Sequence, residues 1–209
     1  MRPIFITGTG TDVGKTIIAA IITEALHADY WKPVQAGYTD GTDSLSVAKM
    51  ITNKKTIIHP ELYKLKLPAS PHISAREENK KISVKNIIKH LPKTSNTLIV
   101  EGAGGLMVPL NETLFVADLI KQLNAKVILV SRNYLGSINH SLLTAEVCRY
   151  YKLDVLGWIF NDQYLAYEEE IVHWSGCHKI AAIPFSPNPD TAFIREHALL
   201  IAAALKRIV

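Results

Sequence analysis

One glycine-rich turn near the N-terminus constrains this chain more than any other feature. An apolar run, Ile4-Phe-Ile-Thr7, leads into Gly8-Thr-Gly-Thr-Asp-Val-Gly-Lys-Thr16, and an apolar helical pattern follows at once. Glycines let the backbone curl until several amide N–H groups face one anion, and the positive end of the helix dipole strengthens the field there. In such a turn Lys15 can reach the β and γ phosphates of a nucleotide, and the Thr16 hydroxyl can ligate Mg²⁺. The sequence therefore predicts a P-loop.

The spacing of this loop differs from the common P-loop. Five residues separate Gly8 from Gly14, where four are usual, and three separate Gly10 from Gly14. The alternative is a glycine-rich turn with a chance Lys-Thr pair after it, and the preceding apolar run argues against that alternative. The motif indicates nucleotide phosphate, but it identifies neither the base nor the reaction.

Short apolar runs alternate along the chain with longer stretches of helical period. Most of the runs are continuous Ile, Val, Leu and Phe, which is typical of parallel strands covered on both faces. The predicted strands are residues 3–7, 30–34, 97–101, 126–131, 155–160 and 179–183. The predicted helices are residues 15–28, 44–51, 84–90, 114–123, 138–151, 164–174 and 191–208. This order favours an α/β fold, a doubly wound and mostly parallel sheet in one P-loop domain over residues 1–209.

One segment, residues 53–79, has no clear period. Pro60, Pro68 and Pro71 interrupt it. We expect a long ordered loop or short turns there, and loops of such length in a compact domain are usually functional or disordered.

Composition limits the class of protein. At 209 residues, 48% apolar and 20% charged, the chain resembles an ordinary globular protein with a sizeable core. No apolar run reaches the 18 or so residues of a membrane span, and the glycine loop begins too early for a signal peptide. Cys148 and Cys177 fit neither a C-x-x-C nor a zinc spacing, so we expect reduced thiols in a cytoplasmic protein. The formal charge of +4 comes from scattered basic residues, which fits an anionic substrate better than nucleic acid.

Two carboxylates are candidate ligands of Mg²⁺. Glu101 ends the apolar run 97–101, and the glycines of Gly102-Ala-Gly-Gly105 leave room for a phosphate to approach. A carboxylate at that position is costly unless it is paired or metal-bound, although an exposed strand end is the alternative. Asp43 lies at the start of the predicted helix 44–51, where a helix N-cap is as good an interpretation as a metal ligand.

Lys32 lies near the end of the predicted second strand, in Trp31-Lys-Pro-Val-Gln-Ala-Gly37. In a doubly wound sheet, ligands bind in the crevice at the carboxyl ends of the strands. A lysine there can neutralise charge on a γ-phosphate or on an acceptor carboxylate. Taken alone, such a lysine is more often a solvated surface residue.

Seven motifs, in order along nearly the whole chain, resemble those of the dethiobiotin synthetases, the ATP-dependent ring-closing enzymes of biotin synthesis. They are T-G-T-G-T-D-V-G-K-T at 7–16, K-P-V-Q-A-G at 32–37, T-D-S at 42–44, A-S-P-H at 69–72, V-E-G-A-G-G at 100–105, L-G-S-I-N-H at 135–140 and G-W-I-F-N-D at 157–162. Each motif is weak alone, whereas the ordered set is specific.

The resemblance implies a reaction and its catalytic residues. CO₂ and 7,8-diaminononanoate would be joined, with MgATP as co-substrate, through an amino carbamate and a carbamic-phosphoric anhydride, and the second amine would expel phosphate. Lys15 would act on the transferring phosphoryl group. Lys32 would stabilise the carbamate and the charge that develops during transfer.

The resemblance also implies the binding residues. Those for ATP are Asp12, Val13, Gly14, Lys15, Thr16, Ile17, Glu101, Gly102, Ala103, Gly104, Asn161, Asp162, Pro184, Phe185, Ser186 and Asp190, with Asn161 and Asp162 reading adenine. Those for Mg²⁺ are Thr16, Asp43 and Glu101. Those for the diamine are Ala36, Ser70, Pro71 and His72, joined by Gly136, Ser137, Ile138 and Asn139 from the second subunit of a homodimer. At one position the chain differs from some relatives: Ala36 replaces a serine, and we expect a water or a backbone group to take the place of the missing hydroxyl. One alternative stays open: Asn139 also fits the N-cap of a helix over 141–151.

The remaining candidates are interpreted as structural. None of the eight histidines forms a spaced metal pair, and Trp158 is expected to pack in the core beside the nucleotide strand.

Three other classes of protein were weighed. A partition-type ATPase is a dimerising switch on DNA or membrane, and it usually has a lysine near the start of the loop, in K-G-G-x-x-K-T. This chain has Thr9-Gly10-Thr11 at that place. The C-terminus of this chain also does not resemble a strongly basic membrane-targeting helix. A cobyrinate-type amide synthetase needs a glutaminase domain, for which 209 residues leave no room. A non-catalytic nucleotide-binding module is disfavoured only by the family resemblance. We therefore expect small-molecule substrates and a homodimer, without nucleic acid or membrane partners.

Overall fold

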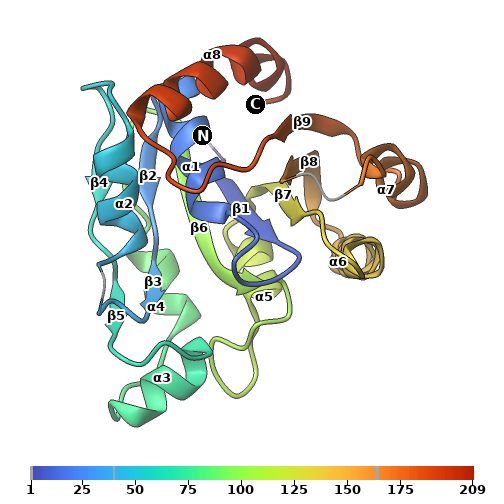
Figure 1. Ribbon diagram of the computed structural model, residues 1–209. Helices are drawn as coiled ribbons and strands as arrows, with labels where there is room; N and C mark the ends of the chain where they lie inside the picture. Colours follow the sequence, from blue (N-terminus) through green and yellow to red (C-terminus); the bar gives the residue numbers. More distant parts are fainter. Residues whose placement is uncertain (1, 40, 163–164) are drawn as a thin grey trace.

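The computed structural model describes residues 2–39, 41–162 and 165–209. Within these residues a seven-stranded parallel sheet has the strand order β4-β2-β6-β1-β7-β8-β9, and helices cover both of its faces (Figure 1). Its strands are β1 (Ile4–Gly8), β2 (Asp29–Trp31), β4 (Ile58–His59), β6 (Leu98–Gly105), β7 (Lys126–Arg132), β8 (Asp154–Asn161) and β9 (Lys179–Ile183). A separate parallel pair is formed by β3 (Val34–Ala36) and β5 (Tyr63–Leu65). The predicted α/β class is confirmed.

The helices are α1 (Lys15–Leu26), α2 (Asp43–Met50), α3 (Pro71–Glu77), α4 (Val84–Lys89), α5 (Val116–Gln122), α6 (Ser137–Tyr151), α7 (Glu168–Ser175) and α8 (Thr191–Ile208). Two apolar layers, one on each face of the sheet, hold them in place. Along β1, for example, Ile4 and Ile6 pack in the layer shared with α1 and α8, whereas Phe5 packs in the layer shared with α5 and α6. Successive side chains of a strand point to opposite faces, so this strand must be apolar throughout. No helix in the described ranges is long and apolar enough to cross a membrane.

Most predicted elements are found within a few residues of their predicted bounds, and residues 179–183 and 191–208 match fully. The start of the helix predicted for 164–174 lies outside the described residues, and α7 begins at Glu168. Trp158 is fully buried in β8, as predicted.

Three predictions about the elements are wrong. The strand predicted for 30–34 ends at Trp31, because Pro33 has no N–H for a ladder bond, and the chain then joins the second sheet as β3. The strand predicted to end at Glu101 continues to Gly105, which pairs with Gly8 of β1, and a Cβ atom at Gly105 would lie only 3.0 Å from the Gly8 carbonyl oxygen. Residues 53–79 are not irregular throughout, since they contain β4, β5 and α3.

The topology brings the candidate residues to one edge of the sheet. The chain builds one side of the sheet from β1 through β2, β4 and β6, and then crosses β1 to build the other side. The carboxyl ends of all these parallel strands therefore meet around the loop that follows β1, where doubly wound sheets bind their ligands. Figure 1 shows the β3–β5 pair and α3 beyond this edge, away from α8.

Candidate active site

The loop after β1 has the conformation that an anion site needs. Gly14, the residue before α1, has φ 91°, a left-handed conformation that glycine adopts readily. A Cβ atom at Gly14 would also overlap the Asn161 side-chain amide, so a larger residue would have to displace that group. In the described chain no side chain caps the N-terminus of α1, which leaves its first amide groups for a ligand.

Lys15 is folded back across this loop. Its Nζ donates a hydrogen bond of 2.6 Å to the carbonyl oxygen of Gly10. Burial lowers the pKa of Lys15 to about 8, an effect that the Glu101 carboxylate opposes and the Lys32 ammonium reinforces. The ammonium therefore lies inside the loop, bound to a backbone carbonyl and close to Glu101 and Lys32.

Glu101 accepts hydrogen bonds from three side chains, one at the start of α1 and two from β2 and the residue that follows it. Its Oε1 accepts from Thr16 Oγ1 at 3.0 Å and from Lys32 Nζ at 2.8 Å. Its Oε2 accepts from the Tyr30 hydroxyl at 2.8 Å. Because only 1% of Glu101 is exposed, the alternative of an exposed strand end is wrong. Burial and the neighbouring carboxylate raise the pKa of Tyr30 well above its usual value, so the phenol remains a donor.

Lys32 lies between two carboxylates. Its Nζ contacts Glu101 on one side and forms an ion pair with Asp43 on the other. Burial would lower the pKa of Lys32, but the two carboxylates outweigh burial and hold the pKa above its usual value. The side chain is a buried ammonium, and the surface interpretation of this lysine is wrong.

Asp43 is held by its backbone as well as by its ion pair. Thr42, not Asp43, is the N-cap of α2, since the Thr42 side chain accepts from the amide of Leu45 at 3.2 Å. The Asp43 amide instead donates to Oε1 of Gln35 at 3.1 Å, and Gln35 Nε2 donates to the Gly37 carbonyl at 2.8 Å. The N-cap interpretation of Asp43 is therefore wrong: Thr42 caps the helix, and the Asp43 carboxylate faces Lys32.

The oxygen donors of this cluster suit a magnesium ion. Mg²⁺ prefers oxygen ligands and keeps several waters, usually with one or two carboxylates and substrate phosphates. Thr16 donates to Glu101, and the Lys32 ammonium contacts both Asp43 and Glu101. All three predicted ligands of Mg²⁺ therefore lie in one cluster. Among the described residues no group of three or more His, Cys, Asp and Glu side chains gathers as a metal site. Two carboxylates and a hydroxyl thus fit an ion that also needs ligands from a bound phosphate.

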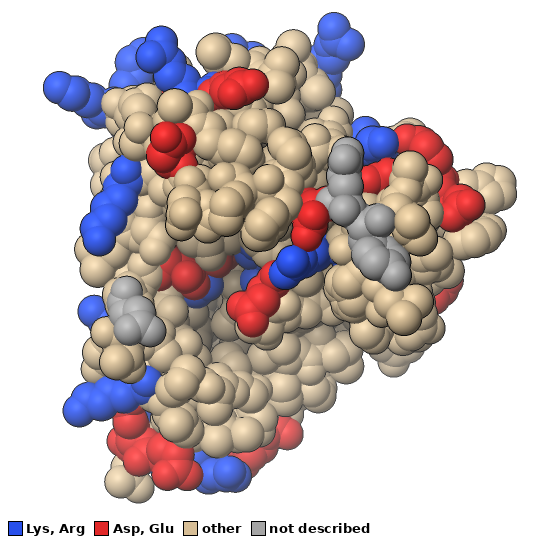
Figure 2. Space-filling model, viewed as in Figure 1, with Lys and Arg blue, Asp and Glu red and all other residues tan. Residues whose placement is uncertain are grey.

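A cavity of about 840 Å³ opens in front of this cluster. It lies between the loop and the segment that follows β5, and Figure 2 shows the hollow with acidic and basic side chains at its mouth. Its lining is Thr11, Asp12, Gly14, Lys15, Thr16, Lys32, Gln35, Ala36, Asp43, Pro68, Ala69, Ser70, Pro71, Glu101, Ala103, Gly104 and Val108.

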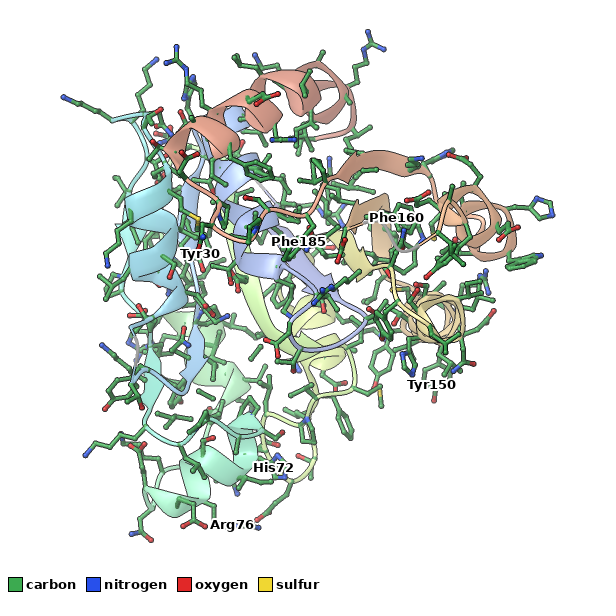
Figure 3. All side chains as sticks on the ribbon, viewed as in Figure 1. Tyr30, His72, Arg76, Tyr150, Phe160 and Phe185 are labelled. Carbon is green, nitrogen blue, oxygen red and sulfur yellow. The ribbon has the colours of Figure 1, made fainter. Side chains whose placement is uncertain are left out.

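Two predicted groups of diamine-site residues lie differently around this cavity. Ser70 and Pro71 line it. His72, which is labelled in Figure 3 and belongs to α3, is not part of the lining, and its Nδ1 lies 3.1 Å from Ser70 Oγ. Residues 136–139 form the start of α6 and line neither cavity of this chain. Asn139 is inside α6, whose N-cap is Gly136, so the N-cap interpretation of Asn139 is wrong.

A second cavity of about 200 Å³ lies on the other side of the same loop. Its lining is Asp12, Gly14, Ile17, Arg132, Asn161, Pro184, Phe185, Ser186, Pro189 and Phe193. Four further residues predicted to bind ATP line neither cavity: Val13, Gly102, Asp162 and Asp190. Val13 accepts from Asn161 Nδ2 at 3.1 Å, and Asp190 caps α8 through a 2.8 Å bond from the Phe193 amide.

Sequence reasoning missed several residues of these sites. Tyr30 donates to the Glu101 carboxylate and Gln35 accepts from the Asp43 backbone amide, yet neither an aromatic residue in a strand nor a lone amide side chain carries a signal of that role. Arg132 and Phe193 line the smaller cavity. Arg132 had a usable signal, because it stands just past a predicted strand, at the edge where ligands bind.

Comparisons with known proteins agree with this geometry. A family model described as an AAA domain matches residues 2–192. The chain is 44% identical over 195 residues to the ATP-dependent dethiobiotin synthetase BioD of Christiangramia forsetii, covering 93% of each chain. It is 53% identical over 162 residues to the protein of the same name from Cytophaga hutchinsonii, covering 77% of each.

Solved structures show the same fold at low identity. The cell division ATPase MinD of Pyrococcus furiosus has a TM-score of 0.64 at 14% identity, over 100% of both chains. A ParA family ATPase from Chlorobium tepidum has a TM-score of 0.57 at 14% identity, over 99% of this chain and 93% of the other. The predicted doubly wound, mostly parallel fold is confirmed, and at such identity the likeness extends to the fold alone.

Proposed function

The chain belongs to the family of ATP-dependent dethiobiotin synthetases, and we propose on that premise that it condenses CO₂ with 7,8-diaminononanoate to form dethiobiotin. Membership makes it an ATP-dependent ligase of biotin biosynthesis. The proposal concerns the steps and the residues, with all of residues 1–209 acting as one synthetase domain. The observation that carries it is the buried Lys32 ammonium, which borders the large cavity beside the loop that presents Lys15.

The first steps need a cation next to an anionic acceptor. One amine of the substrate combines with CO₂ and loses a proton, giving a carbamate. A carbamate oxygen attacks the γ-phosphorus of ATP, the bond to the bridging oxygen breaks, and ADP leaves with that bond's electron pair. Lys32 stays protonated because the two carboxylates raise its pKa, so it can stabilise negative charge on the carbamate and in the transition state.

The last step closes the ring. The second amine attacks the carbonyl carbon of the carbamic-phosphoric anhydride, the carbon–oxygen bond to phosphate breaks, and the amine proton passes to the released phosphate or to water. This step needs the two amines close together more than it needs a further catalyst. The wall formed by Ala36, Ser70 and Pro71 is suited to hold the carbon chain of the diamine, and His72 positions the Ser70 hydroxyl.

The nucleotide is proposed to lie across both cavities. Lys15 and the amides of residues 12–17 would bind the phosphates, with the loop carbonyl of Gly10 exchanged for a phosphate oxygen. The base would occupy the smaller cavity, against Asn161 and residues 184–186. Thr16, Asp43 and Glu101 would hold Mg²⁺, which when bound neutralises charge on the β and γ phosphates and orients them.

A homodimer would complete the diamine site with Gly136, Ser137, Ile138 and Asn139 of the second subunit. Supporting this, large apolar side chains are exposed just before α6 and along one face of it: Leu135, which precedes the helix, is 85% exposed, and Leu143 and Tyr150, seven residues apart in the helix, are 56% and 83% exposed. Figure 3 shows Tyr150 at the outer margin of the molecule. Large exposed apolar groups that lie together mark interaction surfaces. The cytoplasmic location remains a prediction from the sequence.

An omission assay tests the proposal. Phosphate release is followed with diaminononanoate, bicarbonate and MgATP together, and then with each left out in turn. We expect release only from the complete mixture, with dethiobiotin formed in equal amount. Release that ignores the diamine and rises with DNA would support the partition-type ATPase instead.

A further inference from the structure

Arg132, at the end of β7, lines the smaller cavity and contacts two other segments of the chain. Its Nε and one terminal nitrogen both lie 3.1 Å from Asp162 Oδ2, just beyond β8. Its guanidinium carbon lies 5.7 Å from the centre of the Phe185 ring, on the segment between β9 and α8. Arg132 and Phe185 line the cavity, whereas Asp162 does not.

We propose that Arg132 is a specificity-determining residue for the nucleotide base, and that Asp162 acts by orienting Arg132. This rests on the proposed ATP site, since it concerns the base of the nucleotide held there. It reassigns Asp162, because a carboxylate that receives two donors of one guanidinium is engaged in holding that group. Two donors of the planar guanidinium bind one oxygen of the Asp162 carboxylate, which restricts the orientation of the arginine head.

The contact with Phe185 gives Arg132 a second task. Phe185 is 56% exposed on a segment outside the helices and strands, so little protein surrounds its ring. A guanidinium within about 6 Å of an aromatic centroid is attracted to the ring face. Arg132 therefore anchors Phe185 beside the cavity, and because both residues line it, a base there would meet a cation and an aromatic ring in the same wall. Figure 3 places Phe185 over the middle of the sheet, toward the loop that follows β1.

The rest of the lining explains why a base fits. Ile17, Pro184, Pro189 and Phe193 make the cavity apolar. Asn161 uses its amide nitrogen on the Val13 carbonyl, so its amide oxygen is the atom suited to accept from an exocyclic amine of a base. Arg132 adds donors and a stacking surface that favour a large, electron-rich ring system. A purine satisfies all of these groups better than a pyrimidine does.

The chain offers a matched control at the opposite end of β8. Arg2 forms an ion pair of 2.7 Å with Asp154, and its side chain is 39% exposed, against 40% for Arg132. Each arginine pairs with an aspartate at one end of β8. The hydrogen-bond partners of Arg2, Asn124 and Asp154, line neither cavity. Exposed ion pairs contribute little to stability. Loss of either arginine should therefore leave the fold intact, and only loss of Arg132 should alter nucleotide binding.

The test is a set of calorimetric titrations of the full chain with MgATP, MgCTP and magnesium tripolyphosphate, which has no base. The variants are Arg132→Ala, Asp162→Ala, the double variant and Arg2→Ala, each checked by thermal unfolding. We expect Arg132→Ala to weaken MgATP binding about twofold to thirtyfold, the range for loss of a cation–aromatic contact. The preference for ATP over CTP should fall, while tripolyphosphate binding and the Arg2→Ala variant stay at wild-type values.

The double variant separates the two roles. If Asp162 acts only through Arg132, removing both residues costs no more ATP affinity than removing Arg132 alone. Costs that multiply would mean that Asp162 contacts the base independently, and an Arg132→Ala variant that binds like Arg2→Ala would overturn the proposal. Weaker tripolyphosphate binding would place Arg132 on the phosphates and also overturn it. These titrations need no diamine, so a failure of the ring-closing activity would show separately in the omission assay.

Discussion

Replacement of Lys32 by glutamine is the most informative perturbation, because it separates a role in catalysis from a role in folding. The change removes a buried ammonium that contacts Glu101 and pairs with Asp43. Removing one partner of a buried ion pair lowers the free energy of unfolding by about 3–5 kcal/mol, because the remaining charge is left without compensation. Glu101 keeps its bonds from Thr16 and Tyr30, and Asp43 is partly exposed, so we expect the lower limit, about 3 kcal/mol.

That loss has a measurable size in thermal unfolding. For a chain of this length 1 kcal/mol corresponds to a shift in Tm of about 2–4 °C, so Lys32→Gln should unfold roughly 6–12 °C lower than wild type. Addition of Glu101→Gln should recover part of the loss, since the uncompensated carboxylate is then gone. Lys49→Gln, on the exposed side of α2, is the matched control and should leave Tm unchanged.

The kinetic effect should exceed the effect on ATP binding. Removing one preorganised group that stabilises developing charge typically costs about 10²–10³ in kcat, and we expect Lys32→Gln to fall in this range. The KM for ATP should change much less, because Lys15 and the loop amides remain. The assay is phosphate release at a temperature well below the unfolding of the variant. A kcat equal to that of Lys49→Gln would refute the reasoning and leave Lys32 a structural residue.

Three further predictions concern the loop and the metal. Lys15→Ala should abolish turnover while its circular dichroism and Tm stay close to wild type; normal ATP consumption would remove the loop from the mechanism. The affinity for MgATP should fall as the pH rises through about 8, measured by calorimetry, because the free Lys15 ammonium has a pKa of about 8 and only its protonated form attracts the anion; Lys15→Ala should lack this step. Asp43→Asn should raise the Mg²⁺ concentration needed for half-maximal activity at least several-fold, and an unchanged requirement would exclude Asp43 as a ligand.

The parts of this fold that the sequence predicts well are those that depend on neighbours along the chain. The continuous apolar runs of β1 and β7 and the glycine-rich loop are local patterns, and each was found where predicted. The short strands β3, β4 and β5 were missed because two or three residues carry no period. Their pairing depends on partners far along the chain, as with β2 and β4.

In the site, too, the sequence predicts the residues of a local motif and misses the contacts between distant segments. Lys15 and Thr16 follow from the loop motif, whereas the burial of Lys32 depends on carboxylates that lie 11 and 69 residues away along the chain. Tyr30 has no motif, and its hydroxyl reaches Glu101 only because β2 and β6 are adjacent in the sheet. Such contacts are set by strand order, which a pattern within one segment does not contain.

The break at Pro33 shows how one local feature produces a long-range arrangement. The strand cannot continue through a residue without an N–H, so β2 ends and Lys32 projects at the edge of the sheet beside Glu101. The Pro33 carbonyl then accepts from the amides of Leu62 at 3.1 Å and Tyr63 at 2.9 Å, which starts the β3–β5 pair. That pair carries Gln35, the residue that bonds the Asp43 amide, and leads into the far wall of the cavity.

One proline therefore ends the strand that presents the Lys32 ammonium, proposed to be catalytic, and begins the sheet that builds the opposing wall. Pro33→Ala would restore an N–H and relax φ without removing any side-chain contact of Lys32. We expect a modest change in Tm but a rise in the KM for the diamine, since the relative placement of Lys32 and the wall is what the proline fixes. If KM and kcat both stay at wild-type values, the carbonyl bonds to Leu62 and Tyr63 are sufficient to set that placement without the ring.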